Sequence, residues 1–179
     1  MRKEVREHYV QRFGEPEREA EFVPPTGPAI EVLKWSAGQT GEDVAIYSTV
    51  GACEALNGSR TKRHEFFIGF APEVDEVAEA LAEVALEGSG RSRIPGSGDT
   101  IKLPFPLWPN TEAMAFLFTT GDEIIEPLHI SDRTVFFMQL VPLFARELSF
   151  KKQFGEDRLW QRFQELHVPY WDPRRKSAI

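Results

Sequence analysis

The pattern of hydrophobic and polar positions predicts both helices and strands, in mixed order along the chain. Between residues 72 and 87, apolar side chains recur every three or four positions and form one stripe, as in an amphipathic helix. Elsewhere short apolar runs, several of them alternating with a period of two, are typical of strands. The predicted strands are residues 30–35, 43–50, 64–70, 100–103, 113–120 and 134–141.

The two ends of the chain have different patterns. Residues 3–14 place their apolar side chains on one helical face, and proline-rich residues 15–28 then favour an extended connector. Near the other end, Pro142 follows a strand and is suited to the first position of a helix, where its missing N–H costs nothing. Gly155 is expected to end that helix in a left-handed conformation. Glu156 then opens a second amphipathic helix.

This order of elements predicts an α+β fold in a single domain, residues 1–179, with residues 1–21 as an N-terminal helix and connector. We expect a mixed sheet of about six strands covered by helices on both sides, a three-layer α/β sandwich. The domain would end in a strand–helix–helix unit. Neither an internal repeat nor a convincing domain boundary interrupts the chain.

Composition and charge narrow the class of partner. The net charge of −7 disfavours binding to nucleic acid and to anionic membranes and favours a basic protein partner. The single cysteine cannot form an internal disulfide, and no apolar run approaches the length of a membrane span. We therefore expect a cytoplasmic protein. The oligomeric state stays open.

A search for catalytic and metal-binding motifs predicts no cofactor and no metal site. The histidines, at positions 8, 64, 129 and 167, are scattered without ligand spacing. Cys53 and His64 form a conceivable nucleophile and base, but the surroundings of Cys53 match no thiol-enzyme signature, so a small buried thiol is favoured. Residues 95–100, at the end of the glycine-rich loop 88–99 and the start of the next strand, lack the Gly-Lys-Ser/Thr ending of a phosphate loop.

A row of acidic residues on the predicted helix 72–87 is the one charge pattern that suggests binding. Asp75, Glu79, Glu83 and Glu87 are spaced by four and therefore stack along one helical face. Like charges at this spacing destabilise a helix by roughly 0.2–0.5 kcal/mol per pair. An ordinary solvated face is one interpretation, and a ridge that binds a basic partner is the other.

The C-terminal third resembles a known protein family. The run from Phe137 to Phe144, the pair Glu147-Leu148, the Gly155 stop and the Asp172-Pro173-Arg174-Arg175 ending resemble the C-terminal part of suppressor-of-fused-like domains. Phe22-Val23-Pro24-Pro25-Thr26 and Glu65-Phe66-Phe67-Ile68 stand upstream in the order of that family. The strand end Ser48-Thr49-Val50-Gly51 departs from the family's usual turn, which leaves the role of this loop open.

The resemblance implies a mixed α/β domain that binds protein and carries no catalytic residues. Animal members grip a short peptide between this kind of domain and a second one. Bacterial single-domain members are linked to immunity against polymorphic toxins, and this chain is similar to those. The alternatives are a hydrolase-like enzyme using Cys53 or the carboxylates Asp122, Glu123 and Asp132, and a small-molecule sensor with a loop-lined aromatic pocket. The tryptophans, each a core residue or a binding anchor, are at positions 35, 108, 160 and 171.

Overall fold

A computed structural model describes residues 1–55, 61–89 and 95–179. Part of the predicted loop 88–99, residues 90–94, lies outside the described residues. The helices are α1 (Arg2–Phe13), α2 (Ala37–Thr40), α3 (Ala52–Ala55), α4 (Val77–Ser89), α5 (Ala145–Phe154) and α6 (Glu156–Glu165). The strands are β1 (Arg18–Phe22), β2 (Ile30–Trp35), β3 (Ala45–Val50), β4 (Lys62–Phe70), β5 (Thr100–Lys102), β6 (Ala115–Thr120), β7 (Leu128–Ile130) and β8 (Arg133–Leu143).

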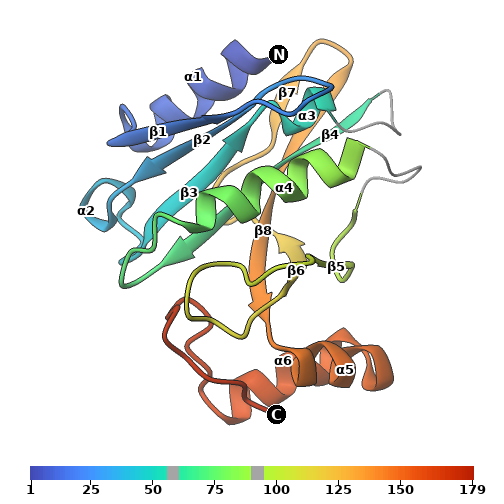
Figure 1. Ribbon diagram of the computed structural model, residues 1–179. Helices are drawn as coiled ribbons and strands as arrows, with labels where there is room; N and C mark the ends of the chain where they lie inside the picture. Colours follow the sequence, from blue (N-terminus) through green and yellow to red (C-terminus); the bar gives the residue numbers. More distant parts are fainter. Residues whose placement is uncertain (56–60, 90–94) are drawn as a thin grey trace.

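Within the described part of the chain, the strands form one mixed eight-stranded sheet. Its order is β1-β2-β3-β4-β8-β6-β5, with β7 paired to β8 beside this path. Neighbouring strands are antiparallel except for β4 and β8, which run parallel from the pair Lys62↔Thr134 to Phe67↔Gln139. The longest strand, β8, therefore joins the N-terminal meander β1–β4 to the strands β5 and β6 (Figure 1).

Helices cover both faces of this sheet, as the predicted three-layer arrangement requires. On one face α4 lies across the strands (Figure 1) and buries Leu81 and Ala85 against Phe66, Phe118 and other strand residues. On the opposite face, α1 packs Tyr9 and Phe13 against Trp35, which belongs to β2. The α+β fold expected from the sequence is confirmed.

The strand β8 contributes to the hydrophobic cores on both faces because its side chains alternate. Met138 and Leu140 point to the α4 side. Phe137 points to the α1 side, where its ring lies 5.2 Å from that of Tyr9. Farther along the same face, Val141 and Leu143 meet a third core formed with α5 and α6. A single strand thus anchors every long helix of the described chain.

The prediction of six strands missed β1 and β7. Strand β1 reads Arg-Glu-Ala-Glu-Phe and is almost wholly exposed at the sheet edge, so it shows no apolar alternation. Strand β7 has three residues, none of them buried, and forms a hairpin with the start of β8. Both strands owe their conformation to pairing with a neighbour, because neither has a buried face of its own.

The predicted helical position of Pro142 was wrong. Pro142 belongs to β8, opposite Phe116 of β6, and the helix begins three residues later. The parallel partner β4 reaches only as far as Gln139 along β8. Beyond that point the Pro142 carbonyl accepts a hydrogen bond of 2.7 Å from Arg175. Since the proline lies where β8 has lost one neighbour, its missing N–H removes no bond from the ladder.

Candidate functional site

The acidic row predicted on residues 72–87 is divided between a turn and a helix. The structure begins α4 at Val77, so Asp75 lies in the preceding turn, and the predicted helix start at Pro72 was too early. Glu79 is exposed on the first turn of α4, and Glu83 and Glu87 follow at partly exposed positions on the same helix. The four carboxylates therefore do not have equal access to a partner.

Asp75 is held by cationic and hydroxyl groups from three strands, β1, β2 and β3. The Lys34 ammonium lies 2.8 Å from its Oδ1 atom, and the Arg18 guanidinium lies 2.5 Å from its Oδ2 atom. The Tyr47 hydroxyl donates to Oδ1 at 3.0 Å. These hydrogen bonds, with that from Lys34 the strongest, lower the pKa of Asp75. Its charge is thus largely neutralised within the fold, whereas Glu79 and Glu83 have no ion pair among the described residues.

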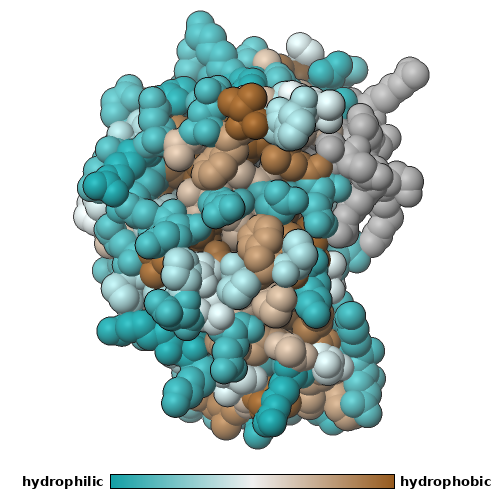
Figure 2. Space-filling model, viewed as in Figure 1, coloured by the Kyte–Doolittle hydropathy of each residue, from teal (hydrophilic) through white to brown (hydrophobic). Residues whose placement is uncertain are grey.

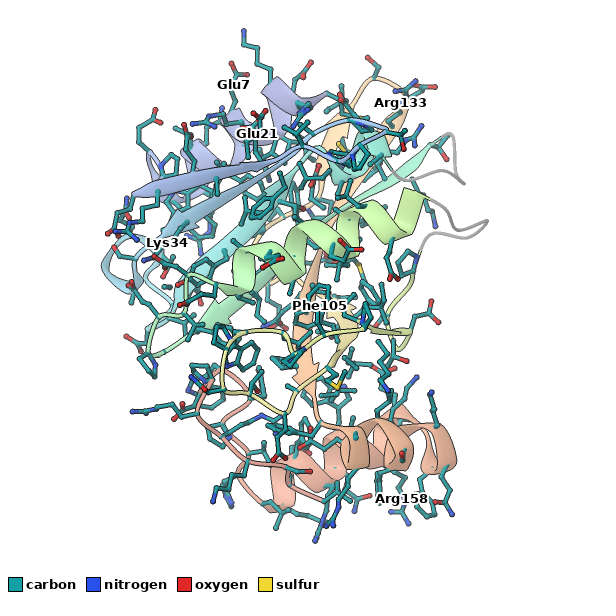
Figure 3. The ribbon with its side chains drawn as sticks, in the orientation of Figure 1. Glu7, Glu21, Lys34, Phe105, Arg133 and Arg158 are labelled. Atoms are coloured by element: carbon teal, nitrogen blue, oxygen red, sulfur yellow. The ribbon has the colours of Figure 1, made fainter. Side chains whose placement is uncertain are left out.

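The Lys34 ammonium is itself buried, although lysine is seldom found inside a protein. It lies 2.6 Å from the Glu73 carboxylate and is also paired with Asp75. The Val74 N–H donates to the Tyr47 hydroxyl at 3.0 Å. Together these contacts fix the turn that leads into α4 to the end of β2 and the middle of β3 (Figure 3 labels Lys34). The turn at the start of α4 is therefore held firmly against the sheet, which fixes the position of the acidic face of the helix.

The proposed pair of Cys53 and His64 does not form. Cys53 is buried on the α1 side of the sheet, and burial raises the pKa of its thiol above the ordinary range. The neighbouring β4 side chain that reaches the Cys53 segment is Glu65, whereas His64 points to the other face, as successive strand residues do. A buried, protonated thiol is a poor nucleophile, so Cys53 acts as a core residue.

Glu65 was not identified from the sequence. Its fully buried carboxylate accepts hydrogen bonds from the backbone N–H groups of Gly51, Ala52 and Cys53, at 2.9, 3.2 and 3.1 Å, and from the Thr49 hydroxyl at 2.6 Å. Burial raises the pKa of this carboxyl. The feature of the sequence that could have identified Glu65 is a single carboxylate within an apolar strand. Glu65 holds the turn after β3, at the segment where the chain departs from the family's usual turn.

The carboxylates proposed for an enzyme are spread over exposed turns. Asp122 and Glu123 follow β6, whereas Asp132 lies in the turn between β7 and β8, and all three are exposed. Within the described ranges, no three histidine, cysteine or acidic side chains converge as metal ligands. Loop residues Gly96 and Asp99 bond to each other ahead of β5, as expected for a structural turn.

A second buried ion pair joins the C-terminal tail to α5. The Arg175 guanidinium donates to both carboxylate oxygens of Glu147, at 2.7 and 3.0 Å, and neither side chain is more than 5% exposed. Glu147 also accepts a hydrogen bond from the Phe144 N–H at the start of α5. The ring of Phe144 and that of Phe163 lie 4.8 and 5.4 Å from the guanidinium carbon. Both residues belong to segments singled out in the sequence as family-like.

The four tryptophans divide between the cores and the surface. Trp35 is fully buried and donates to the Gly14 carbonyl at 2.8 Å, and Trp108 packs against Phe70. Trp160 is half-buried beside Tyr170. Trp171 is 44% exposed, although its carbonyl accepts a hydrogen bond from the Ala71 N–H. Trp171 is therefore the one with a ring accessible to a partner. No helix within residues 1–55, 61–89 and 95–179 is long and apolar enough to cross a membrane.

Comparisons with known structures agree on one fold. A SUFU homologue from Neisseria gonorrhoeae matches with a TM-score of 0.75 and 21% identity, covering 99% of this chain and 96% of that chain. Sufu from a Sufu–Fu complex matches with a TM-score of 0.72 and 14% identity, covering 98% of this chain and 91% of that chain. Drosophila Suppressor of Fused matches with a TM-score of 0.73 and 13% identity, covering 98% of this chain and half of that chain.

The family comparison extends over most of the sequence. None of the curated proteins compared with the chain matches it significantly. A model of the family described as suppressor of fused protein (SUFU) matches residues 26–176. This range includes the acidic α4, the Glu65 turn and the Glu147–Arg175 pair. The chain therefore belongs to the suppressor-of-fused protein family.

Proposed function

We propose that this chain is a non-enzymatic protein-binding domain that acts as a bacterial immunity protein in the cytoplasm. Its partner would be a basic toxin domain, bound against the acidic residues Asp75, Glu79, Glu83 and Glu87. The exposed Glu79 and the partly exposed Glu83 would make the intermolecular contacts, and Asp75 would hold the base of the helix in place. The observation that carries this proposal is the row of carboxylates along α4 and the turn before it, two of which have no ion pair within the described residues.

Two further observations support a role in binding rather than in catalysis. The buried thiol of Cys53 is kept protonated by burial, and the carboxylates Asp122, Glu123 and Asp132 lie apart on exposed turns. The complex of Sufu with Fu is a protein–protein complex formed by a protein of the same fold. A carboxylate row on a rigid helix would steer a basic partner and accelerate its association.

Co-expression with the protein encoded by the adjacent gene tests the proposal. We expect the wild-type chain to form a complex that survives size-exclusion chromatography and to protect cells from the growth arrest caused by that protein. The double variant Glu79→Lys/Glu83→Lys should lose both properties because its helix would repel a basic partner. The binding is also expected to weaken steeply as salt is added, since exposed charges are screened.

A control places one such charge reversal on another helix, for comparison with the single variant Glu79→Lys. Glu7 is exposed on α1, on the opposite face of the sheet, so Glu7→Lys should retain binding and protection. Figure 3 labels Glu7. Equal loss in the Glu7 and α4 variants would contradict a role specific to α4, and the absence of any complex or protection by the wild-type chain would contradict the immunity function.

A further inference from the structure

The charge of this acidic protein is distributed unevenly, and its C-terminal unit is basic. Residues 145–179 contain eight lysines and arginines and five acidic residues, a net charge of +3. Because the whole chain carries −7, residues 1–144 carry −10. The helices α5 and α6 and the tail lie at the end of the molecule away from α1 (Figure 1). A partner attracted to this end would need a charge opposite to that of a partner of α4.

Three adjoining hollows mark the surface of this basic unit. One, of about 540 Å³, is bordered by Phe150 and Phe154 of α5 and by Arg158 of α6. Another, of about 670 Å³, lies between Arg146 and the tail residue Lys176. A third, of about 410 Å³, shares Phe150 with the first and Arg146 with the second. The three hollows adjoin one another along α5 through these shared lining residues and are referred to together below as the α5 groove.

The α5 groove combines apolar surface with cations that lack a carboxylate partner. Phe154 is 52% exposed, an unusual position for a large apolar side chain, and its ring packs on that of Phe150 at 4.7 Å. Arg146, Arg158 and Lys176 have no ion pair within the part of the chain that the structure describes. Figure 2 shows hydrophobic side chains reaching the surface among hydrophilic ones at this lower end.

The remaining side-chain charges of the groove largely neutralise one another. Arg162 lies 3.4 Å from Glu165, and Arg174 lies 2.9 Å from Asp172. The Arg175 guanidinium is already paired with the buried carboxylate of Glu147. Glu112, on the far rim of the largest hollow, is the acidic side chain without such a partner in the described residues. The side chains thus leave an excess of positive charge along the groove.

We propose that the α5 groove binds an acidic peptide segment that carries an aromatic or large aliphatic anchor. The anchor would lie against Phe150 and Phe154, and carboxylates on both sides of it would pair with Arg158, Arg146 and Lys176. The ten-residue α5 is about 15 Å long, the reach of about four or five residues of extended chain. This site is separate from the acidic face of α4 and does not depend on the immunity function.

The same observations disfavour a nucleic acid as occupant. A phosphate backbone is a long polyanion and would also meet the remainder of the protein, whose charge is −10. A short acidic peptide can contact the basic end alone. Apolar surface between cations also matches a peptide with alternating acidic and apolar side chains better than a uniform run of phosphates.

Fluorescence anisotropy of a labelled synthetic peptide, with glutamates on both sides of a central phenylalanine, tests the proposal on the full chain. We expect saturable binding that weakens with added salt. Replacing the phenylalanine of the peptide by serine, or its glutamates by lysines, should weaken binding by about tenfold or more. Arg158→Glu and Phe154→Ser in the protein should each have a similar effect. Both side chains are exposed, so the melting temperature should not change.

The matched control is Arg133→Glu, the same charge reversal at the other end of the molecule (Figure 3 labels Arg133 and Arg158). It should bind the peptide like the wild type. The proposal is overturned if Arg133→Glu weakens binding as much as Arg158→Glu, if the lysine peptide binds as well, or if single-stranded DNA binds more tightly at the groove. Sedimentation showing a dimer that Arg158→Glu dissociates would overturn it in favour of a second copy of the chain.

Discussion

The guanidinium of Arg175 is enclosed by the C-terminal unit, where it meets the carboxylate of Glu147, the carbonyl of Pro142 and two aromatic rings. Replacing such a buried group leaves its partner charged and unpaired. The pair also connects the end of β8, the start of α5 and the tail, through a single side chain. Arg175 is therefore a structural residue, despite its basic charge beside the α5 groove.

We expect Arg175→Ala to lower the free energy of unfolding by about 3–5 kcal/mol, because the carboxylate of Glu147 stays buried without its cation. Urea denaturation measures this change. The neighbouring variant Arg174→Ala removes an exposed guanidinium and should leave the stability unchanged. Equal effects of the two substitutions would contradict the account of Arg175.

His64 is expected to make stability depend on pH. Burial lowers its pKa to about 4, against a backbone hydrogen bond at Pro95 that acts in the opposite direction. The unfolded chain takes up this proton near pH 6.5, whereas the folded chain stays neutral until about pH 4. The unfolded state therefore binds more protons in this window, and the stability is lost as the pH falls through it.

Comparison of urea unfolding at pH 7 and pH 5 measures this effect. We expect His64 to account for a loss of about 2 kcal/mol between these values, since one pKa unit corresponds to about 1.4 kcal/mol. The variant His64→Phe should lack this part of the pH dependence. His129→Gln, at an exposed position, should keep it. If the free energy of unfolding of His64→Phe falls by as much as that of the wild type between pH 7 and pH 5, other groups cause the loss.

At the scale of elements, Gly155 joins α5 to α6 with a backbone that other residues adopt only under strain. Its φ of +91° is positive, as the sequence suggested, but its ψ of 169° places it outside the left-handed helical region expected for a helix cap. A Cβ atom at this position would have no neighbour within 4 Å, so a substitution acts through the backbone alone. The junction depends on glycine for its conformation, not for space.

We expect Gly155→Ala to lower the free energy of unfolding by about 1–3 kcal/mol. Gly38 is a suitable control, because its Cβ would also have no neighbour within 4 Å and its φ is not positive. Gly38→Ala in the short helix α2 should be neutral or stabilise the fold slightly. Thermal melts of the two variants compare them directly, and identical melting temperatures would contradict a strained junction.

The elements that carry a buried apolar face could be predicted from the sequence, and those that depend on a distant partner could not. The stripe of α4 and the alternation of β8 identify both elements because the core selects apolar residues at those spacings. Strand β1 has no such face. The sequence around Pro142 favours a helix start, and only the structure shows that β4 ends before reaching this part of β8. Local patterns contain no information about where a neighbouring strand stops.

The candidate sites, too, could be predicted from the sequence only in part. The carboxylate row of α4 follows from spacing along one helix, and only the structure shows that Lys34 and Arg18 neutralise Asp75. The α5 groove is formed by side chains from two helices and the tail, with Glu112 on its far rim, and its lining residues are up to about sixty-five positions apart in the chain. The sequence identified these segments as family-like, but their shared surface arises only after folding.

At the scale of the whole molecule, the three hydrophobic cores share β8 and should unfold together. Trp35 lies in the core under α1, and Trp160 borders the core under α5 and α6. We expect the variants Trp35→Phe and Trp160→Phe, which each remove one reporter, to give the same urea midpoint by fluorescence as by circular dichroism. An earlier fluorescence transition in Trp35→Phe than in Trp160→Phe would show that the C-terminal unit unfolds independently.

The parallel pairing of β4 with β8 also governs the order in which the protein forms during synthesis. The partner of Lys62 is Thr134, so about seventy residues must be made before β4 acquires its second neighbour. At ribosomal rates of about 5–20 residues per second, the open edge of β4 persists for several seconds. The segment that includes Phe66 and Phe67 lacks its β8 partners Met138 and Gln139 during that interval, so its backbone N–H and C=O groups on that side are unpaired. A nascent chain with an unpaired apolar strand is a substrate for chaperones, and slowing translation between β4 and β8 should increase its aggregation.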